Sequence, residues 1–233
     1  MKLNQVTKLL IISSVISLPA TAAELEISIT NLTHGNHFTP LFIAAHDADS
    51  HIFQVGEMAS SALQKMAEGG DIGDLDAAIM GTNGITVTNP ASGLLAPSAK
   101  VDAIMLNTGT MTHLSIAAMV LPTNDAFVGL DAWQIPTEAG SYTFTLNAYD
   151  AGTEANDEII NGGGMSGVPG IPAAPSGDGG MNASGVMDMS NNDKVHIHPG
   201  VLGDTDLQGG MSDLDSRVHR WLNPVARVTV IVK

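Results

Sequence analysis

The sequence predicts an all-β domain, an antiparallel β-sandwich with one or two short helices in its N-terminal half and a long glycine-rich loop. Three observations support this fold class. Short stretches alternate apolar and polar residues, as half-buried strands do. Turn residues separate these stretches, which is typical of sandwiches. Helical segments do not regularly separate the strands, so a parallel α/β fold is disfavoured.

The beginning of the chain has the features of a secretory signal peptide. Two lysines precede an apolar run over residues 9–18, and small residues follow at 19–23. The apolar run is too short to span a bilayer. We therefore predict a signal peptide over residues 1–23, cleaved after Ala22 or Ala23, and export to the periplasm or the outside of the cell. A buried N-terminal helix is the alternative.

We treat residues 24–233 as one β domain of about 210 residues, a length that also fits two small domains. Residues 25–30 alternate and predict a strand, and the apolar run 41–45 is a second candidate. Residues 59–67 change to helical spacing, with a serine able to cap the start and two glycines at the end. A further helical turn is expected over 74–80.

Strands dominate the remainder of the chain. Residues 113–121 are an unbroken apolar run, which suits a core strand, and 226–232 alternate as a buried or edge-closing strand. The other two predicted strands cover 101–106 and 141–149. Residues 161–192 contain nine glycines and three prolines, and we predict a flexible Gly/Met/Ser-rich surface loop there.

Composition narrows the classes of partner. The chain has no cysteine, so neither disulfides nor a lipid-attachment cysteine is available. Removing Lys2 and Lys8 leaves 7 basic residues against 24 acidic ones, a formal net charge of −17. Such a surface repels nucleic acid and anionic lipid and attracts cations. Simple solubility is the alternative explanation for this charge.

Catalytic motifs are not found. The sequence has no G-x-S-x-G, no H-E-x-x-H, no P-loop and no cysteine nucleophile. A Ser-His-Asp triad leaves no local signature, because its members are brought together only by the fold. We expect a binding protein rather than an enzyme.

One acidic turn could hold a cation. Asp150 and Glu154 flank Gly152 directly after a predicted strand, with Asp157 and Glu158 close behind. Calcium takes six to eight oxygen ligands, several of them carboxylates, from a loop that folds around it. A solvated acidic turn remains the alternative.

Other polar pairs are weaker candidates for a metal site. His196 and His198 would share one face of a strand, an arrangement that zinc or copper can use. The remaining groups are Asp47 with Asp49, Asp204 with Asp206, Asp213 with Asp215, and the histidines His34, His37, His46 and His51. Ordinary polar loops and hydrogen-bonded histidines explain these equally well.

Four motifs in order resemble the spondin N-terminal domain family, which has animal members and many bacterial exported members. Residues 38–46 and 53–70 look like the family's apolar strand, histidine and A-S-x-x-L-x-x-x-A-E-x-G helix. Residues 124–130 are similar to its P-D-W-x-V-G-L segment, and 149–154 to its W-D-A-G-T-D turn. Residues 219–227 look like the end of bacterial members.

The resemblance implies a C2-like antiparallel sandwich that binds calcium at loops on one end. It implies that Asp125, Asp150 and the position of Glu154 supply the carboxylate ligands. Glu154 stands where the family usually has Asp, and Ala126 replaces an aromatic residue. Both departures alter the expected packing around the ion. The cysteines of the animal members and their thrombospondin-type repeats are absent, so their adhesion roles transfer weakly.

The sequence therefore predicts an exported, calcium-binding β module for adhesion or for binding a protein or glycan. A purely structural exported protein whose ion only holds loops together is the second hypothesis. A metal-dependent hydrolase using His196 and His198 is the third.

Overall fold

The computed structural model describes residues 22–161, 164–173, 193–206 and 209–233. The predicted signal peptide, apart from its last two residues, lies outside the described residues. So does most of the glycine-rich segment, residues 174–192.

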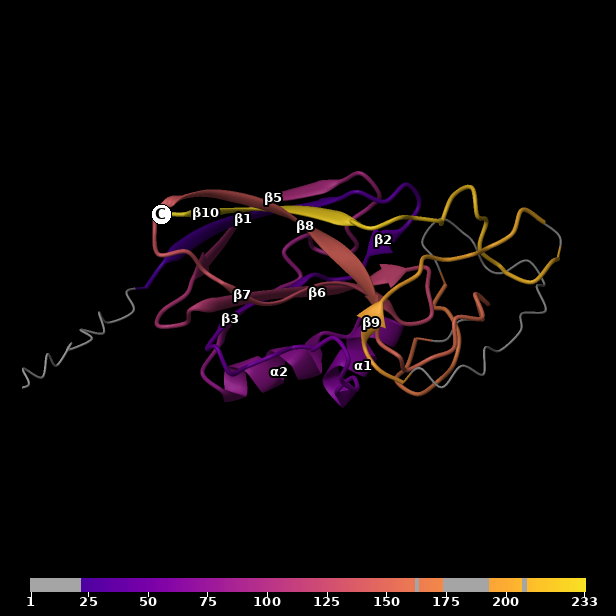
Figure 1. Ribbon diagram of the computed structural model, residues 1–233, viewed down its shortest axis with the longest axis horizontal. Helices are drawn as coiled ribbons and strands as arrows, with labels where there is room; N and C mark the ends of the chain where they lie inside the picture. The colour runs from indigo at the N-terminus through magenta and orange to yellow at the C-terminus, as the bar shows by residue number, and fades with distance from the viewer. Residues whose placement is uncertain (1–21, 162–163, 174–192, 207–208) are drawn as a thin grey trace, which may run out of the picture.

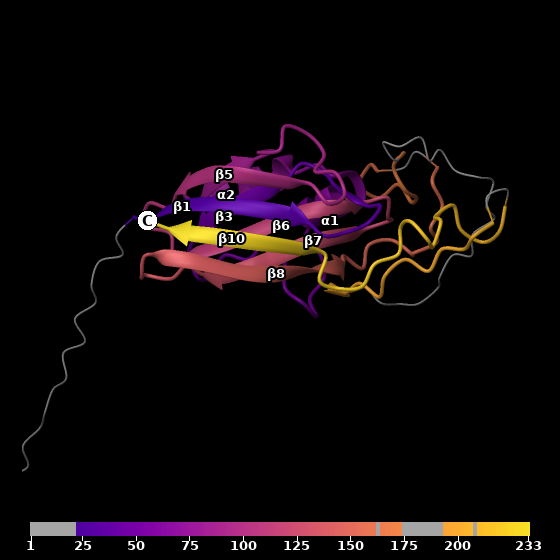
Figure 2. The same ribbon diagram turned by 90° about the horizontal axis from the view of Figure 1, so that it is seen from above.

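A single antiparallel sheet of ten strands forms the body (Figure 1). Along the main path the strands lie in the order β4-β3-β6-β7-β8-β10-β1-β5, with β2 beside β6 and β9 beside β8. Their bounds are β1 Glu24–Asn31, β2 His37–Phe38, β3 Phe42–His46, β4 Ile85–Thr88, β5 Lys100–Asn107, β6 His113–Leu121, β7 Ala126–Gln134, β8 Gly140–Asp150, β9 His196–Ile197 and β10 Ala226–Val232. Figure 2 shows β5, β1, β10 and β8 side by side in the upper layer.

Strand β8 joins the two layers of this sheet. Its residues 140–146 pair with β10 in the upper layer, and residues 147–150 pair with β7 in the lower layer. At the other side, β5 returns close to β4. The C2-type sandwich expected from the sequence is not confirmed: the long β8 crosses between the layers without a break, so the sheet curls into a nearly closed, barrel-like body.

The inner core fills the space between the layers. In β1 and β10 every second side chain is buried there, including Ile27, Ile29, Val228 and Val230. The alternation predicted for residues 25–30 and 226–232 is thus the pattern of strands with one face on the core and one on solvent. Strand β10 lies between β1 and β8 and is not an edge strand.

A second core lies between the lower layer and two helices, α1 (Ser61–Gly69) and α2 (Gly73–Gly81), seen below the sheet in Figure 1. Strand β6 contacts both cores, which explains its unbroken apolar run: Ile116 faces the inner core and Met119 the helices. The Ser60 side chain accepts a hydrogen bond from the Leu63 amide and caps α1.

Gly70 ends α1 at a φ of 72°, a left-handed conformation in which glycine is unstrained. The predicted serine cap and glycine stop are both confirmed.

The four predicted strands after residue 100, the strand at 25–30, that at 41–45 and both helical segments are all confirmed within a residue or two. Strand β7 was not predicted from periodicity, because Gly129 and Asp131 interrupt its apolar pattern. The short β2, β4 and β9 were also missed. In the part of the chain that the structure describes, no helix is long and apolar enough to cross a membrane.

Candidate metal centre at the loop tip

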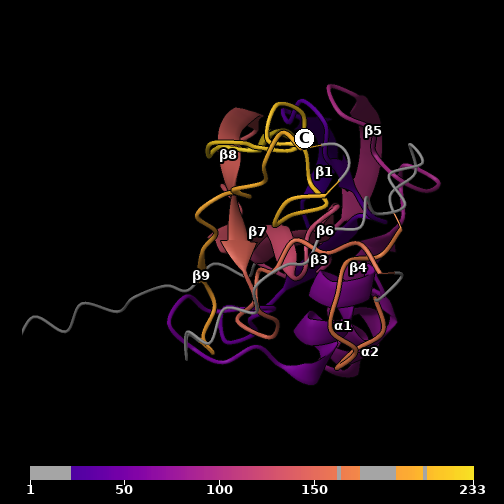
Figure 3. The same ribbon diagram turned by 90° about the vertical axis from the view of Figure 1, so that its right-hand side faces the viewer.

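The pairing of β7 with β8 brings the predicted carboxylates together. Ala126, the first residue of β7, lies opposite Asp150, the last residue of β8. Asp125 immediately precedes β7, so it enters the same end of the barrel from a second loop. We call this end the loop tip, meaning residues 122–125, 150–160 and 196–204; Figure 3 looks onto it.

Asp125 is fully buried at the loop tip. Its Oδ2 accepts hydrogen bonds from the Thr153 amide (2.8 Å), the Thr153 hydroxyl (3.2 Å) and the Glu154 amide (3.1 Å). Its Oδ1 is buried and has no hydrogen-bond partner. Burial, aided by the charge of Asp150, raises the pKa of Asp125 to about 7 against these hydrogen bonds.

Asp150 is also buried, but both its oxygens are bonded. Oδ1 accepts from the Gly152 amide at 2.7 Å, and Oδ2 accepts from the Asn156 side chain at 2.7 Å. The first bond closes the turn around Gly152, whose φ of 70° is left-handed. An added Cβ there would meet the Lys194 amide nitrogen at 2.6 Å, so the turn packs tightly against the chain leading into β9.

Glu154 is half-buried and, like Asp125, has one bonded and one unpartnered oxygen. Its Oε2 accepts hydrogen bonds from the Gly170 amide (2.9 Å) and the Asn124 side chain (3.3 Å). Its Oε1 is buried without a partner. Burial, with the nearby charges of Glu68 and Asp125, raises the pKa of Glu154 to about 7.

Two histidines lie near Asp150: His196 in β9 and His198 directly after it. The Nε2 atoms of His196 and His198 lie 3.8 Å and 4.0 Å from Asp150 Oδ2. His198 Nδ1 accepts from the Gly200 amide, so the neutral ring carries its proton on Nε2, which is buried without a hydrogen-bond partner. Burial lowers the pKa of His198 to about 4, and the ring is therefore neutral near pH 7.

His196 has the opposite tautomer when neutral. Its Nδ1 donates to the Lys194 carbonyl at 2.8 Å, which leaves the Nε2 lone pair on the side of Asp150. A zinc or copper site using both histidines would need both Nε2 atoms unprotonated. The bond from the Gly200 amide to His198 Nδ1 opposes that arrangement.

The loop tip thus holds acidic side chains that are not paired with a lysine or an arginine. In residues 22–161, 164–173, 193–206 and 209–233, no lysine or arginine is ion-paired with Asp125, Asp150 or Glu154. Buried carboxylates without such pairing are costly. Two orphaned oxygens, Asp125 Oδ1 and Glu154 Oε1, fit a hard cation, which prefers oxygen ligands.

The described side chains do not by themselves complete a metal site. Among them, no three or more histidine and acidic side chains are placed so that all could bind one ion. Calcium commonly takes backbone carbonyls and waters as further ligands. An ion at the loop tip would therefore need ligands beyond these side chains.

Sequence reasoning missed the role of Asn124. Its side-chain amide donates to Glu154 and to Asp157 Oδ1 (3.1 Å), and its carbonyl oxygen accepts from the Glu158 amide (3.2 Å). Glu158 in turn accepts from the Leu202 and Gly203 amides. These contacts bind the loop after β8 to the loop after β9, and no local pattern in the sequence signals them.

The remaining weaker candidates make ordinary polar contacts. Asp47 accepts from the Asp49 amide and the Ser50 hydroxyl, and the buried His46 bonds Ser115. Asp204 caps backbone amides of its own loop, and Asp215 pairs with Arg217. None of the contacts described for these groups is to Asp125, Asp150 or Glu154.

Comparison with known proteins bears on the same residues. A family model with the description Spondin_N matches residues 30–158, more than half of the chain. The matched range includes Asp125, Asp150 and Glu154 and ends before β9. The chain matches no curated protein.

Proposed function

The chain belongs to the Spondin_N family, and from this premise we propose that it is an exported binding module whose loop tip is held in shape by a calcium ion. Asp125, Asp150 and Glu154 would supply side-chain oxygens to that ion. The observation that carries the proposal is the pair of buried, unpartnered oxygens, Asp125 Oδ1 and Glu154 Oε1.

The physical argument rests on charge. Calcium supplies two positive charges and accepts oxygen ligands without demanding a rigid geometry. It would offset the repulsion between Asp125 and Asp150 and the cost of burying Glu154. Loops ordered in advance bind a partner at a lower entropic cost. We propose an adhesion or recognition role for the loop tip, toward a protein or a glycan, which that ordering would favour.

Thermal unfolding of the mature chain tests the ion. Calcium at about 100 times its Kd stabilises by about 2.7 kcal/mol, which for a chain of this size raises Tm by roughly 5 to 10 °C relative to a chelator. Asp125→Asn and Asp150→Asn should each abolish the shift. Asp47→Asn, at an exposed aspartate far from the loop tip, should keep it.

Two results would contradict the proposal. If calcium leaves Tm unchanged in the wild-type chain, the ion is not part of the fold. If Asp150→Asn retains the full shift, Asp150 is not a ligand. Export is tested separately, by asking whether the full-length chain is processed near Ala22 and recovered outside the cytoplasm.

Binding is tested by capture of envelope or cell-surface material with and without chelator. Capture that depends on calcium supports a recognition role. Capture that is equal under both conditions would favour the second hypothesis, in which the ion only holds the loops together.

A further inference from the structure

Strands β7 and β8 form a hairpin whose arms separate. They pair only at their bases, residues 126–129 with 147–150. Beyond that, residues 130–134 of β7 pair only with β6, and residues 140–146 of β8 pair only with β10. Each arm therefore has one side without a neighbouring strand in the described part of the chain.

The free side of β8 is the more regular of the two. All seven residues from Gly140 to Leu146 are in uninterrupted register with β10. They include no charged residue and no proline. On β7, by contrast, the register shifts opposite Ser115, and Ala132 has a φ of 47°, so that arm is kinked.

The ends of the sheet are better protected than β8. Strand β4 has only four residues. Strand β5 carries the Lys100–Asp102 ion pair, a register shift and Ala103 at a φ of 54°. Short length, charges and bulges are the means by which proteins prevent further strands from adding to an edge. The free edge of β8 has none of these.

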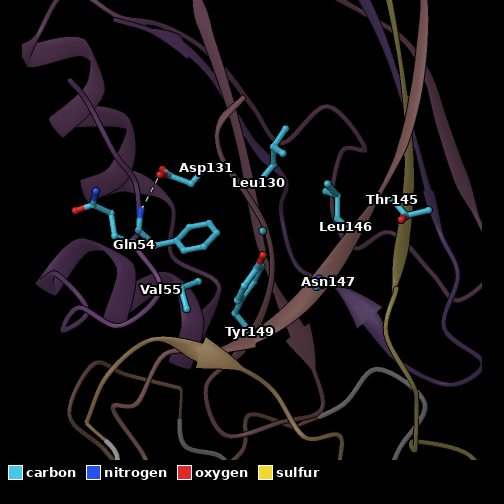
Figure 4. A pocket seen from close by; sticks show the side chains of 10 residues that line it. Gln54, Val55, Leu130, Asp131, Thr145, Leu146, Asn147 and Tyr149 are labelled. Carbon is cyan, nitrogen blue, oxygen red and sulfur yellow. Dashed lines mark hydrogen bonds between the residues drawn. The ribbon is translucent and has the colours of Figure 1, made fainter. Parts of the chain in front are cut away.

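Two clefts flank this edge. The first, of about 380 Å³, lies beside residues 145–149 and is lined in part by Leu130, Asp131 and Tyr149. Figure 4 shows Leu130 and Leu146 on separate strands, with the Tyr149 ring below them in the view. The second, of about 390 Å³, lies beside Tyr142 at the hairpin loop.

Partly exposed aromatic residues border the same edge. Trp133 of β7 packs on Phe144 of β8, with ring centroids 4.9 Å apart, and lies 6.3 Å from Tyr142. A strand added along β8 would cover these rings and continue the upper layer of the sheet.

Charge selects the occupant. Asp131 and Glu138 line the clefts, and neither cleft contains a lysine or an arginine. The whole chain carries a formal charge of −15, so a second copy would bring like charge to the edge. We propose that the free edge of β8, residues 140–146, binds an extended, neutral or basic peptide segment of another protein by strand addition. This site does not depend on calcium at the loop tip.

A labelled peptide, acetyl-Lys-Val-Thr-Val-Thr-Val-Lys-amide, tests the proposal on the mature chain. We expect saturable binding by fluorescence polarisation and slower amide hydrogen exchange confined to residues 140–146. The same peptide with alternate backbone nitrogens methylated cannot donate those hydrogen bonds and should bind at least about tenfold more weakly. Adding chelator should leave the affinity of both peptides unchanged, because the site does not depend on calcium.

A matched pair of variants localises the site. Thr143→Lys places a charge on the exposed face of β8 and should weaken peptide binding about tenfold. Thr88→Lys makes the same change on β4 and should leave it unchanged. Equal binding of the methylated peptide, exchange protection on β4 or β5, or no binding at millimolar peptide would each overturn the proposal. A wild-type dimer that Thr143→Lys dissociates would overturn it in favour of a second copy.

Discussion

The inner core and the loop tip differ in the kind of side chain that they bury. In the inner core, aliphatic side chains such as Ile27, Ile116 and Val228 are buried without any polar atom to satisfy. At the loop tip, Asp125 is buried and Glu154 is half-buried, and each has one buried oxygen without a partner and a raised pKa. The core is complete from its own residues, whereas the loop tip needs a proton or a cation from outside.

That difference separates the apolar core from the proposed ion site. Burying apolar area stabilises the fold under any ionic condition. Burying unpaired carboxylates costs free energy unless a ligand compensates. The two regions should therefore respond differently to mutation, to pH and to calcium, and four predictions test the contrast.

The largest effect is expected in the core. Ile116→Ala removes a fully buried side chain at the centre of β6 and should lower the free energy of unfolding by about 2 to 5 kcal/mol. Urea unfolding measures the loss, which should be the same with calcium and with chelator. A loss that depended on calcium would break the proposed independence of the two regions.

The next largest effect is expected on the pH dependence of the free energy of unfolding. Folded Asp125 titrates at about pH 7 against an ordinary value of 3.8, so between these values the folded state binds the extra proton and stability falls as pH rises. In chelator, raising the pH from 5 to 8 should destabilise the wild-type chain by roughly 2 to 4 kcal/mol more than Asp125→Asn.

His198 opposes this trend, because its lowered pKa makes stability rise between about pH 4 and 6.5. The opposing contribution is common to both chains and cancels in the comparison. Saturating calcium should remove the difference near pH 8 or reverse its sign. A wild-type and a variant chain with parallel pH profiles would contradict the raised pKa.

A smaller loss is expected from Asn124→Ala. The substitution leaves the Glu158 amide without its acceptor and removes the donor to Glu154 and Asp157. Unpaired buried groups of this kind cost about 1 to 3 kcal/mol. Thermal unfolding in chelator measures the loss. If calcium replaces the missing contacts to Glu154, the loss should shrink when the ion is added.

The smallest effect is expected at the helix cap. Ser60→Ala removes the acceptor for the Leu63 amide at the start of α1 and should cost about 1 kcal/mol. Ser60→Asp keeps a capping oxygen and should restore most of the stability. Both variants should show the wild-type response to calcium, because the Ser60 cap makes its contact with Leu63 at the start of α1 and none with the predicted ligands.

The strands and helices with a clear period could be predicted from the sequence. Ser60 and Gly70 marked the ends of α1, and alternation marked β1 and β10. Strand β7 could not be found this way, since Gly129 lies under the Phe53 ring and Asp131 accepts from the Ile52 amide. Both residues contact a segment that is distant in the sequence. The alternation of apolar and polar residues indicates only which faces of a strand are buried, so it cannot reveal such contacts.

The candidate site likewise could be predicted from the sequence only in part. The sequence by itself determined which carboxylates were available, since Asp150 and Glu154 stand on one turn around Gly152. Only the tertiary structure decided that Asp125 lies beside them, that Asn124 holds the loops together and that β8 crosses between layers and leaves an edge free. The physical reason is range: turns and caps form between residues close in the chain, whereas burial, raised pKa values and strand order depend on groups that meet only when the chain has folded.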